Sequence, residues 1–351
     1  MSSEEALERQ YRSFLREHGV SEDFLTIPRE ALEAFDREAR ERDVRDGLSR
    51  SRVPLSTDAN SAIRYQSRQI LAAIKSSPVG QLEIATLTGI FPTGSINAQA
   101  RRCSGGALIL INEGLIAFIQ QFIGILLQYS AVQDRLLSVV PPDRFGRAKT
   151  VRSLAEIFTD YVKRGANPSL SRKYCPVGGY LGRLHTILNA ECSYFVLAHE
   201  HAHAALGHLG KERQMRVATT PVGDIHLIEK SWQEEAAADV AALQLQLVLS
   251  KSQEEMFARL PFVFASIWLF FSIDGLVDRL HREVADVIGV NLPIICDHPP
   301  GQLRLRAINE WLIERQANDA VFGRAEAFRE PLNELEDDLI KAVLSEVEGP
   351  Q

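Results

Sequence analysis

Residues 199–203 read His-Glu-His-Ala-His and form an HExxH motif. On a helix, His199 and His203 would lie on one face with Glu200 beside them. Two imidazoles and a carboxylate are typical ligands of a hydrolytic zinc ion, whose fourth position holds water, and an adjacent glutamate can take a proton from that water. The motif therefore predicts two metal ligands, His199 and His203, and a general base, Glu200.

A third ligand is expected from the segment SWQEEAAAD at residues 231–239. Ser231 and Glu234 have the spacing of a helix-capping box, which gives Glu234 a structural role. Glu235 is then the predicted third ligand, on a face whose alanines would allow close packing against the HExxH helix. Asp239, one turn later, can accept the spare N–H of a ligand histidine and fix its orientation.

Other histidines near the motif are predicted to have lesser roles. His201 would lie about 200° around the helix from His199, so it should face away from the metal. His208 follows Gly207 beyond the expected helix end, and we expect it to cap the helix or to contact a ligand. His226 is a candidate third ligand or transition-state donor, but the role of an ordinary loop histidine is favoured.

The elements that position these residues follow from hydrophobic periodicity. Residues 190–206 and 232–249 are predicted to be helices. Cys192, Phe195 and Val196 share a face with the two motif histidines, so the imidazoles should point toward the core. A buried polar pair needs a reason to be there, and the competing interpretation is a pair of hydrogen-bonded core histidines.

Upstream, residues 95–116 predict a β-hairpin with a Gly-Gly turn, an apolar second strand at 107–111 and a helix from about Glu113. Further helices are predicted over 4–17, from Pro28 into a charged run, over 260–273 as a core helix too short to cross a bilayer, and over 331–347. The expected class is mainly α with a small β-sheet, that is, α+β. The expected domains are a charged helical extension and linker at 1–60, a core at 61–310 with an insertion at about 130–189, and an amphipathic tail at 311–351.

The composition is that of a globular protein, because 45% of the 351 residues are hydrophobic and 24% are charged. A net charge of -7 leaves no basic excess to neutralise nucleic acid, so nucleic acid is an unexpected partner. The four cysteines form no CxxC pair, and the first ten residues are acidic where a signal peptide would be basic. We therefore expect a cytoplasmic protein without stable membrane insertion, for which peripheral contact through residues 260–273 is the alternative.

Four segments together resemble one family. HEHAHAALGH and EAAAD resemble the HExxHxxxxH and ExxxD motifs of gluzincin metallopeptidases related to HtpX and the CAAX prenyl proteases. INAQA resembles the Asn-Ala strand of that family. DHPPGQLRLR resembles its His-Pro-Pro segment with an arginine six residues after the histidine, here His298 and Arg304. The segments occur in the family's order between about residues 95 and 310.

The resemblance implies a zincin-like protease core in which Glu200 is the base and Glu235 is the third ligand. It also implies that the strand at 107–111 is an edge for pairing with an extended peptide. His298 and Arg304 become candidates to contact the ligands or the developing oxyanion, with a structural anchor as the other role for His298. The chain departs from the family in its long insertion and in lacking the family's transmembrane helices.

These observations predict a zinc-dependent endopeptidase with one Zn²⁺ per chain and a protein or peptide substrate. Within the enzymes, cytoplasmic regulatory or phage-defence proteases of the Lit or ImmA type are the nearest alternative, because they also use HExxH. From another class, the alternative is a catalytically silent zinc-binding interaction module. Imidazole and carboxylate also accept other divalent metals, and the oligomeric state stays open.

Overall fold

The structure, a computed structural model, is mainly helical with two small three-stranded sheets, which confirms the α+β class. The described residues are 3–30, 33, 37, 41, 56–79, 82, 84–132, 146–164, 179–209, 216–220, 223–227, 229–250, 252–288, 295–296, 299–314 and 319–348. The helices are α1 (Ser3–Glu17), the 3-10 helix η1 (Glu22–Leu25), α3 (Ser61–Ser76), α4 (Glu113–Val132), α5 (Arg147–Arg164), α6 (Gly179–Ala205), α7 (Glu229–Val248), α8 (Gln253–Ile288), α9 (Gly301–Glu314) and α10 (Asp319–Glu348). The strands are β1 (Ala85–Phe91), β2 (Ala98–Cys103), β3 (Gly106–Asn112), β4 (Arg216–Thr220), β5 (Gly223–Leu227) and β6 (Ile295–Cys296).

The first sheet has β3 at its centre, parallel to β1 and antiparallel to β2. The predicted hairpin and the helix that follows it are confirmed by β2, β3 and α4, whereas β1 had no predicted counterpart. The expectation that residues 107–111 form an edge was wrong. Every residue of β3 is buried, because β1 and β2 pair with its two edges and helices cover both faces of the sheet.

The hairpin turn is Ser104–Gly105 rather than the predicted Gly-Gly pair. Gly105 has φ 88°, a left-handed conformation that glycine adopts at low cost. Gly106 is already the first residue of β3, where a Cβ would stand 2.2 Å from the carbonyl oxygen of Ala85 on β1. Gly105 thus allows the left-handed turn, and Gly106 allows β1 and β3 to approach closely.

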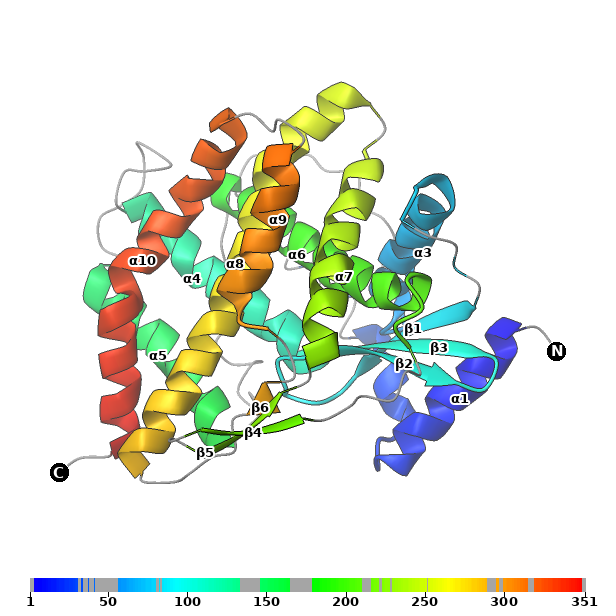
Figure 1. The fold of residues 1–351 in the computed structure, drawn as a ribbon, viewed down its shortest axis with the longest axis horizontal. Coiled ribbons are helices and arrows are strands. Elements are labelled where there is room, and N and C mark those ends of the chain that lie inside the picture. Colours follow the sequence, from blue (N-terminus) through cyan, green and yellow to red (C-terminus); the bar gives the residue numbers. More distant parts are fainter. Residues whose placement is uncertain are drawn as a thin grey trace.

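Helices cover both faces of this sheet (Figure 1). On one face, α1 packs against β1 and β3 through the buried side chains Leu7, Tyr11, Phe14 and Leu15, which confirms the amphipathic helix predicted there. On the other face, the alternate residues Ile109 and Ile111 join the larger core of the helical body. The predicted second helix from Pro28 lies largely outside the described residues.

The helix that carries the HExxH motif is longer than expected. It begins at Gly179, so the predicted start at Ala190 was wrong, and α5 lies within the region that was predicted to be an insertion. Leu154 and Phe158 of α5 are fully buried in the core shared with α4 and α10. Residues 133–145 and 165–178 of the predicted insertion lie outside the described residues.

The helix after the motif, α7, begins at Glu229, two residues before Ser231. The predicted capping box of Ser231 and Glu234 was therefore wrong, because a capping residue must precede the first helical turn. The helix α7 ends at Val248, one residue before the predicted end at residue 249.

The apolar run at 260–273 lies within α8, and many of its side chains are buried in the core, as predicted. Asp274 ends the apolar run but not the helix, which continues to Ile288. By length and composition alone, residues 254–287 would be long and apolar enough to cross a membrane, and 61% of their most apolar window is buried inside the protein. The last helix, α10, begins at Asp319, twelve residues before the predicted start at Pro331.

A second sheet was not predicted. Its strand order is β4-β5-β6, with β4 antiparallel and β6 parallel to β5. It lies on the same side of the helical body as the lower end of α7 (Figure 1).

Candidate metal centre

The helix α6 places His199 and His203 one turn apart with their rings converging. Their Nε2 atoms are 3.0 Å apart. The same face of α6 carries Phe195 and Val196, which are buried. The face that the sequence assigned to the core therefore carries both histidines into a protected position, in which His199 is 6% exposed.

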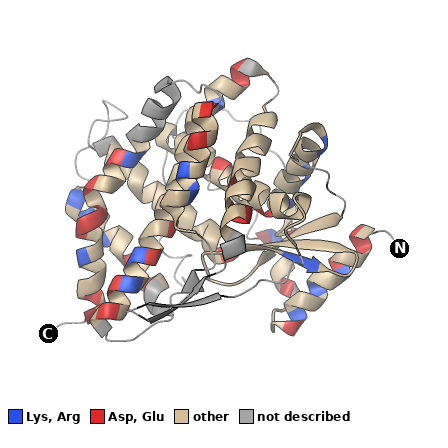
Figure 2. Cartoon of the chain, in the orientation of Figure 1, with Lys and Arg blue, Asp and Glu red and all other residues tan. Residues whose placement is uncertain are grey.

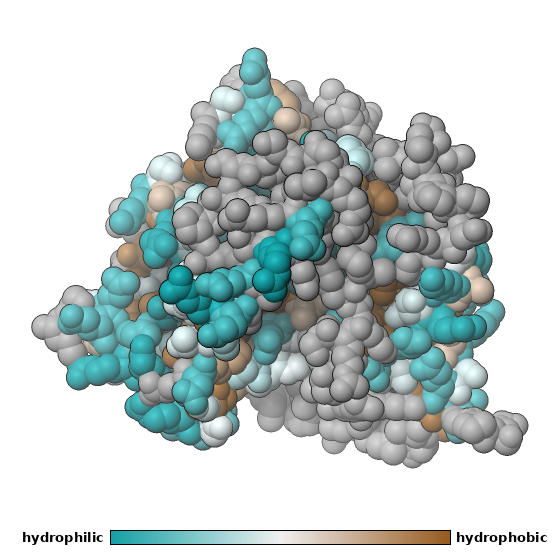
Figure 3. All heavy atoms as spheres, turned by 180° about the vertical axis from the view of Figure 1, so that it is seen from behind, coloured by the Kyte–Doolittle hydropathy of each residue, from teal (hydrophilic) through white to brown (hydrophobic). Residues whose placement is uncertain are grey.

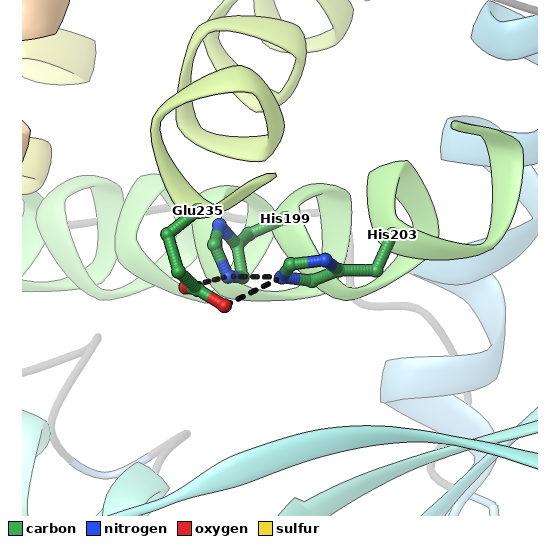
Figure 4. Close-up of side chains that lie close together, drawn as sticks. All are labelled: His199, His203 and Glu235. Carbon is green, nitrogen blue, oxygen red and sulfur yellow. Dashed lines mark hydrogen bonds and ion pairs between the residues drawn. The ribbon is translucent and has the colours of Figure 1, made fainter. Parts of the chain in front are cut away.

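Glu235 reaches the two histidines from α7, which crosses α6 (Figure 4). Its Oε2 lies 3.2 Å from Nε2 of His199, and its Oε1 lies 3.2 Å from Nε2 of His203. Ala238 and Ala242 on α7 are fully buried, and small side chains of this kind let the two helices approach closely. The ligand atoms of His199, His203 and Glu235 all lie within 4.8 Å of one another, so this group could hold a metal ion.

The donor set fits zinc in chemistry and in spacing. Zinc takes imidazole nitrogen and carboxylate oxygen at about 2.0–2.1 Å in tetrahedral geometry, so its donor atoms should stand about 3.3 Å apart. The two imidazole nitrogens are 3.0 Å apart, and each lies 3.2 Å from a different oxygen of Glu235. With one ligand atom from each residue, the three atoms lie within 4.8 Å of one another. A small rotation of the Glu235 carboxylate would bring one oxygen toward both nitrogens, as binding an ion of this size requires.

Asp239 orients the first of these histidines. Its Oδ1 lies 2.9 Å from Nδ1 of His199, and the carboxylate is fully buried. An acceptor on Nδ1 keeps that nitrogen protonated and leaves Nε2 as the free electron pair for a metal. Asp239 thus stands where the sequence predicted it.

Arg304 completes this arrangement from α9. Its Nε donates to Asp239 Oδ2 at 2.8 Å and its Nη2 donates to Oδ1 at 2.7 Å, a bidentate pair, while Nη2 also lies 3.5 Å from Glu235 Oε2. The start of α9 lies close to α8: a Cβ on Gly301 would stand 2.6 Å from the carbonyl oxygen of Phe271. The guanidinium also lies 4.8 Å from the centre of the Phe271 ring. The arginine of the His-Pro-Pro segment thus belongs to the same cluster as the histidines.

The charges of the cluster favour a cation. Burial by itself lowers the pKa of His199, but the carboxylates of Asp239 and Glu235 outweigh burial and raise it to about 10. Burial raises the pKa of Asp239, whereas Arg304 and His199 overcome that effect and hold it below its usual range. Two buried carboxylates face one arginine, so the cluster stabilises further positive charge, whether on an imidazolium or on a metal.

His203 has its own supporting contact. Its Nδ1 lies 3.0 Å from Nδ1 of His208, and the backbone N–H of His208 donates to the carbonyl of His203 at 2.9 Å. Gly207, with φ 70°, turns the chain back at the helix end and makes this possible. His199 and His203 therefore each have a partner on Nδ1, Asp239 and His208 respectively. His208 contacts a candidate ligand, which is one of the two roles predicted for it.

Glu200 and His201 lie between the two ligand positions in sequence but differ in surroundings. Glu200 is 7% exposed and follows His199 directly on α6. His201 points away from the cluster, as predicted: its Nε2 lies 2.7 Å from Ser67 Oγ, which accepts a hydrogen bond from Thr88 at 2.8 Å. Burial lowers the pKa of His201 to about 4, so this ring is neutral and ties α6 to α3 and β1.

Two predicted residues cannot be placed against the cluster. His226 lies in β5, paired with Val217 and Ile295, but its side chain is outside the described residues, as is the whole of His298. Sequence reasoning missed Ser67 and Thr88, since neither residue belongs to a motif. Arg304 was indicated only by its spacing from the His-Pro-Pro segment.

Comparisons of the chain with protein-family models, with curated proteins and with solved structures found no match. The resemblance to gluzincins therefore rests on the four motifs and on the cluster that residues from three of them form.

Proposed function

We propose that this chain is a zinc-dependent endopeptidase of the gluzincin type with a zincin-like core. The observation that carries the proposal is the convergence of His199, His203 and Glu235, whose ligand atoms lie within 4.8 Å of one another beside Glu200. Among the residues that the structure describes, two histidines and a glutamate form the group, which would leave one position of a tetrahedral ion open, as hydrolytic sites do and closed structural sites do not. This difference favours a hydrolase over a silent zinc-binding module.

His199, His203 and Glu235 would hold the metal, with Asp239 and His208 fixing the two imidazoles. When bound, zinc supplies a Lewis acid that polarises the scissile carbonyl and makes water acidic. Glu200 then accepts the proton of the attacking water and returns it to the leaving amine. Arg304 holds Asp239 ionised, so that Asp239 keeps its hydrogen bond to His199 throughout.

The substrate is expected to bind as an extended peptide along β2, the edge strand of the sheet that contacts α6. Strand addition supplies main-chain hydrogen bonds without requiring one sequence. In Figure 4 the ligand cluster lies on the side of α6 that faces the strands. This position replaces the strand at 107–111, which is central and has no free edge.

Metal content and cleavage test the proposal together. Wild type and Glu200→Ala should each bind about one zinc, whereas His203→Ala and Glu235→Ala should lose it. Glu234→Ala, on the neighbouring residue of α7, is the matched control and should keep the metal. Metal is measured by inductively coupled plasma mass spectrometry and cleavage by mass spectrometry of a proteome-derived peptide mixture.

Glu200→Ala should reduce cleavage by about 10²–10⁴-fold at unchanged zinc content, because it removes the general base alone. A folded wild type that binds no zinc when zinc is supplied would refute the site. Zinc binding without any cleavage would instead favour the silent interaction module.

A further inference from the structure

The outer edge of β2 exposes a defined set of backbone groups. The backbone N–H of Asn112 donates to the carbonyl of Asn97, so the hydrogen-bonded pairs of the hairpin are those of 97, 99, 101 and 103 with β3. The backbone groups of Ala98, Ala100 and Arg102 therefore point outward. The N–H of Ala98 is taken by the side chain of Asn97, which leaves Ala100 and Arg102 as the main pairing positions.

The opposite edge of the sheet is closed by side chains. Arg64 donates to the carbonyl of Thr88, Asn60 accepts from the N–H of Ile90, and Tyr11 donates to the carbonyl of Ile90. Side chains that occupy the backbone groups of an edge strand prevent another strand from pairing there. A peptide that extends this sheet must therefore add to β2.

The two faces of β2 differ in chemistry. Ala98 and Ala100 pack against the helical core, on the α6 side of the sheet. Arg101 faces α1, with its guanidinium 5.2 Å from the centre of the Phe14 ring. Arg102 alternates with Arg101 and thus stands on the same side as the two alanines, toward α6.

Arg102 is a basic side chain available beside the open edge. It is exposed and forms no ion pair with another described residue. In Figure 2 part of β2 is coloured blue for its basic residues, in a chain whose net charge is -7. The small side chains of Ala98 and Ala100 leave the arginine as the largest group on this face of the strand.

We propose that Arg102 selects an acidic side chain in the substrate segment bound to β2, an inference that rests on the endopeptidase function above. A residue directly opposite Arg102 would have its Cβ about 5 Å away, with its side chain on the same face. An Asp or Glu at that position pairs with the guanidinium, and a Lys or Arg is repelled. Substrate choice is then set partly by charge, beside the sequence-tolerant backbone pairing.

The test measures peptide binding to the zinc-loaded full chain carrying Glu200→Gln, which prevents cleavage. The probes are fluorescein-labelled extended peptides in pools that carry Glu, Gln or Lys at one fixed position and are random elsewhere. Arg102→Gln should weaken binding of the Glu pool by about 2- to 5-fold, the size of a cross-strand charge pair. Arg102→Glu should reverse the order and favour the Lys pool. Arg101→Gln, on the opposite face of the same strand, is the matched control and should leave the order unchanged.

The inference is overturned if no pool is preferred by wild type, or if Arg102→Gln and Arg101→Gln change the order equally. It is also overturned if Arg102→Gln only increases self-association, measured by light scattering, because Arg102 would then merely keep the edge from pairing with another copy. Charge-selective binding with no cleavage by the enzyme that retains Glu200 would preserve the binding edge and reject the endopeptidase function, so the two failures are distinguishable.

Discussion

Asp239 contacts the ring of His199 and the guanidinium of Arg304 at the same time, and all three groups are buried. The aspartate therefore links a candidate metal ligand to the guanidinium of Arg304, which is always positively charged. In the proposed site its contribution to metal binding would be electrostatic and orientational, because it contacts Nδ1 of His199, on the far side of the imidazole from Nε2.

Asp239→Asn should weaken zinc binding by about 10- to 100-fold, since the amide is nearly isosteric but carries no charge to increase the basicity of His199. The dissociation constant is measured by competition with a chromophoric chelator, and circular dichroism checks the fold. Asp286→Asn, at an exposed position on α8, should leave it unchanged. Equal affinities for the aspartate and asparagine proteins would mean that His199 needs no charged partner.

His185, on the first half of α6, contributes a pH dependence that is separate from the candidate metal centre. It is 8% exposed, and its Nε2 lies 2.8 Å from the carbonyl oxygen of Gln120. Burial lowers its pKa below the ordinary value of 6.5, although the contact with Gln120 raises it somewhat. The unfolded chain therefore takes up a proton near pH 6.5 that the folded chain binds only at lower pH, so this residue destabilises the fold as the pH falls.

We expect the free energy of unfolding of wild type, relative to that of His185→Gln, to decrease as the pH falls from about 7 to about 5. Urea unfolding at each pH measures the difference, with chelator present so that metal release does not contribute. A difference that stays constant over this range would show that His185 titrates alike in both states.

Local helix geometry explains which residues of the candidate site could be predicted from the sequence. The i, i+4 spacing brings His199 and His203 together on any helix. His201 lies two residues from each, so the same geometry places it on the opposite face. The partners of His201, Ser67 and Thr88, are brought in by tertiary packing and carry no motif. Arg304 is 65 residues from Asp239 in sequence, and periodicity cannot reveal a pairing over that distance.

Among the elements, α1 shows that a helix can be recognised from sequence while its partner is not. The spacing of its apolar residues predicts the helix, but nothing in residues 4–17 indicates that it covers β1 and β3. Because Leu7 is 1% exposed in that contact, α1 is part of the sheet's packing.

Leu7→Ala should lower the free energy of unfolding by about 2–5 kcal/mol, the cost of a cavity in a packed core. Glu4→Ala on the exposed side of α1 should change it little. Denaturant unfolding measures both. A loss below about 0.5 kcal/mol for Leu7→Ala would show that α1 docks only weakly in solution.

The strands were harder to predict than the helices. A two-residue turn between alternating or apolar runs signals a hairpin, which is why β2 and β3 were found. The strand β1 joins β3 in parallel through a long connection, and parallel pairing has no turn signal. The same missing strand explains the error over β3, which is an edge only if β1 is absent.

For the whole molecule, the apolar helix α8 raises the question of membranes. Its side chains Ala265, Ile267 and Ile273 are at most 1% exposed, and Ser266 donates to the carbonyl of Leu188 on α6 at 3.2 Å. On the face drawn in Figure 3, hydrophilic side chains predominate among the described residues and hydrophobic ones form small separate areas. The apolar length of α8 is thus used in packing.

We expect the protein to stay in the soluble fraction when mixed with liposomes and floated on a density gradient, because exposing α8 would require separating it from α6 and α10. Vesicles with and without anionic lipid test charge attraction at the same time. Flotation with neutral vesicles would point instead to peripheral binding through residues 260–273.

The burial of β3 on both faces has a consequence for folding. Its sequence, GALILIN, is uncharged and lacks proline, like segments that pair between chains when exposed. The strand is covered only after distant parts of the chain meet. The hydroxyl of Tyr11 donates a hydrogen bond to the carbonyl of Ile90, 79 residues away, and the ring of His201 contacts the hydroxyl of Ser67, 134 residues away. Closing such long loops is slow. Refolding is therefore a competition between loop closure and aggregation, and its yield should fall as protein concentration rises.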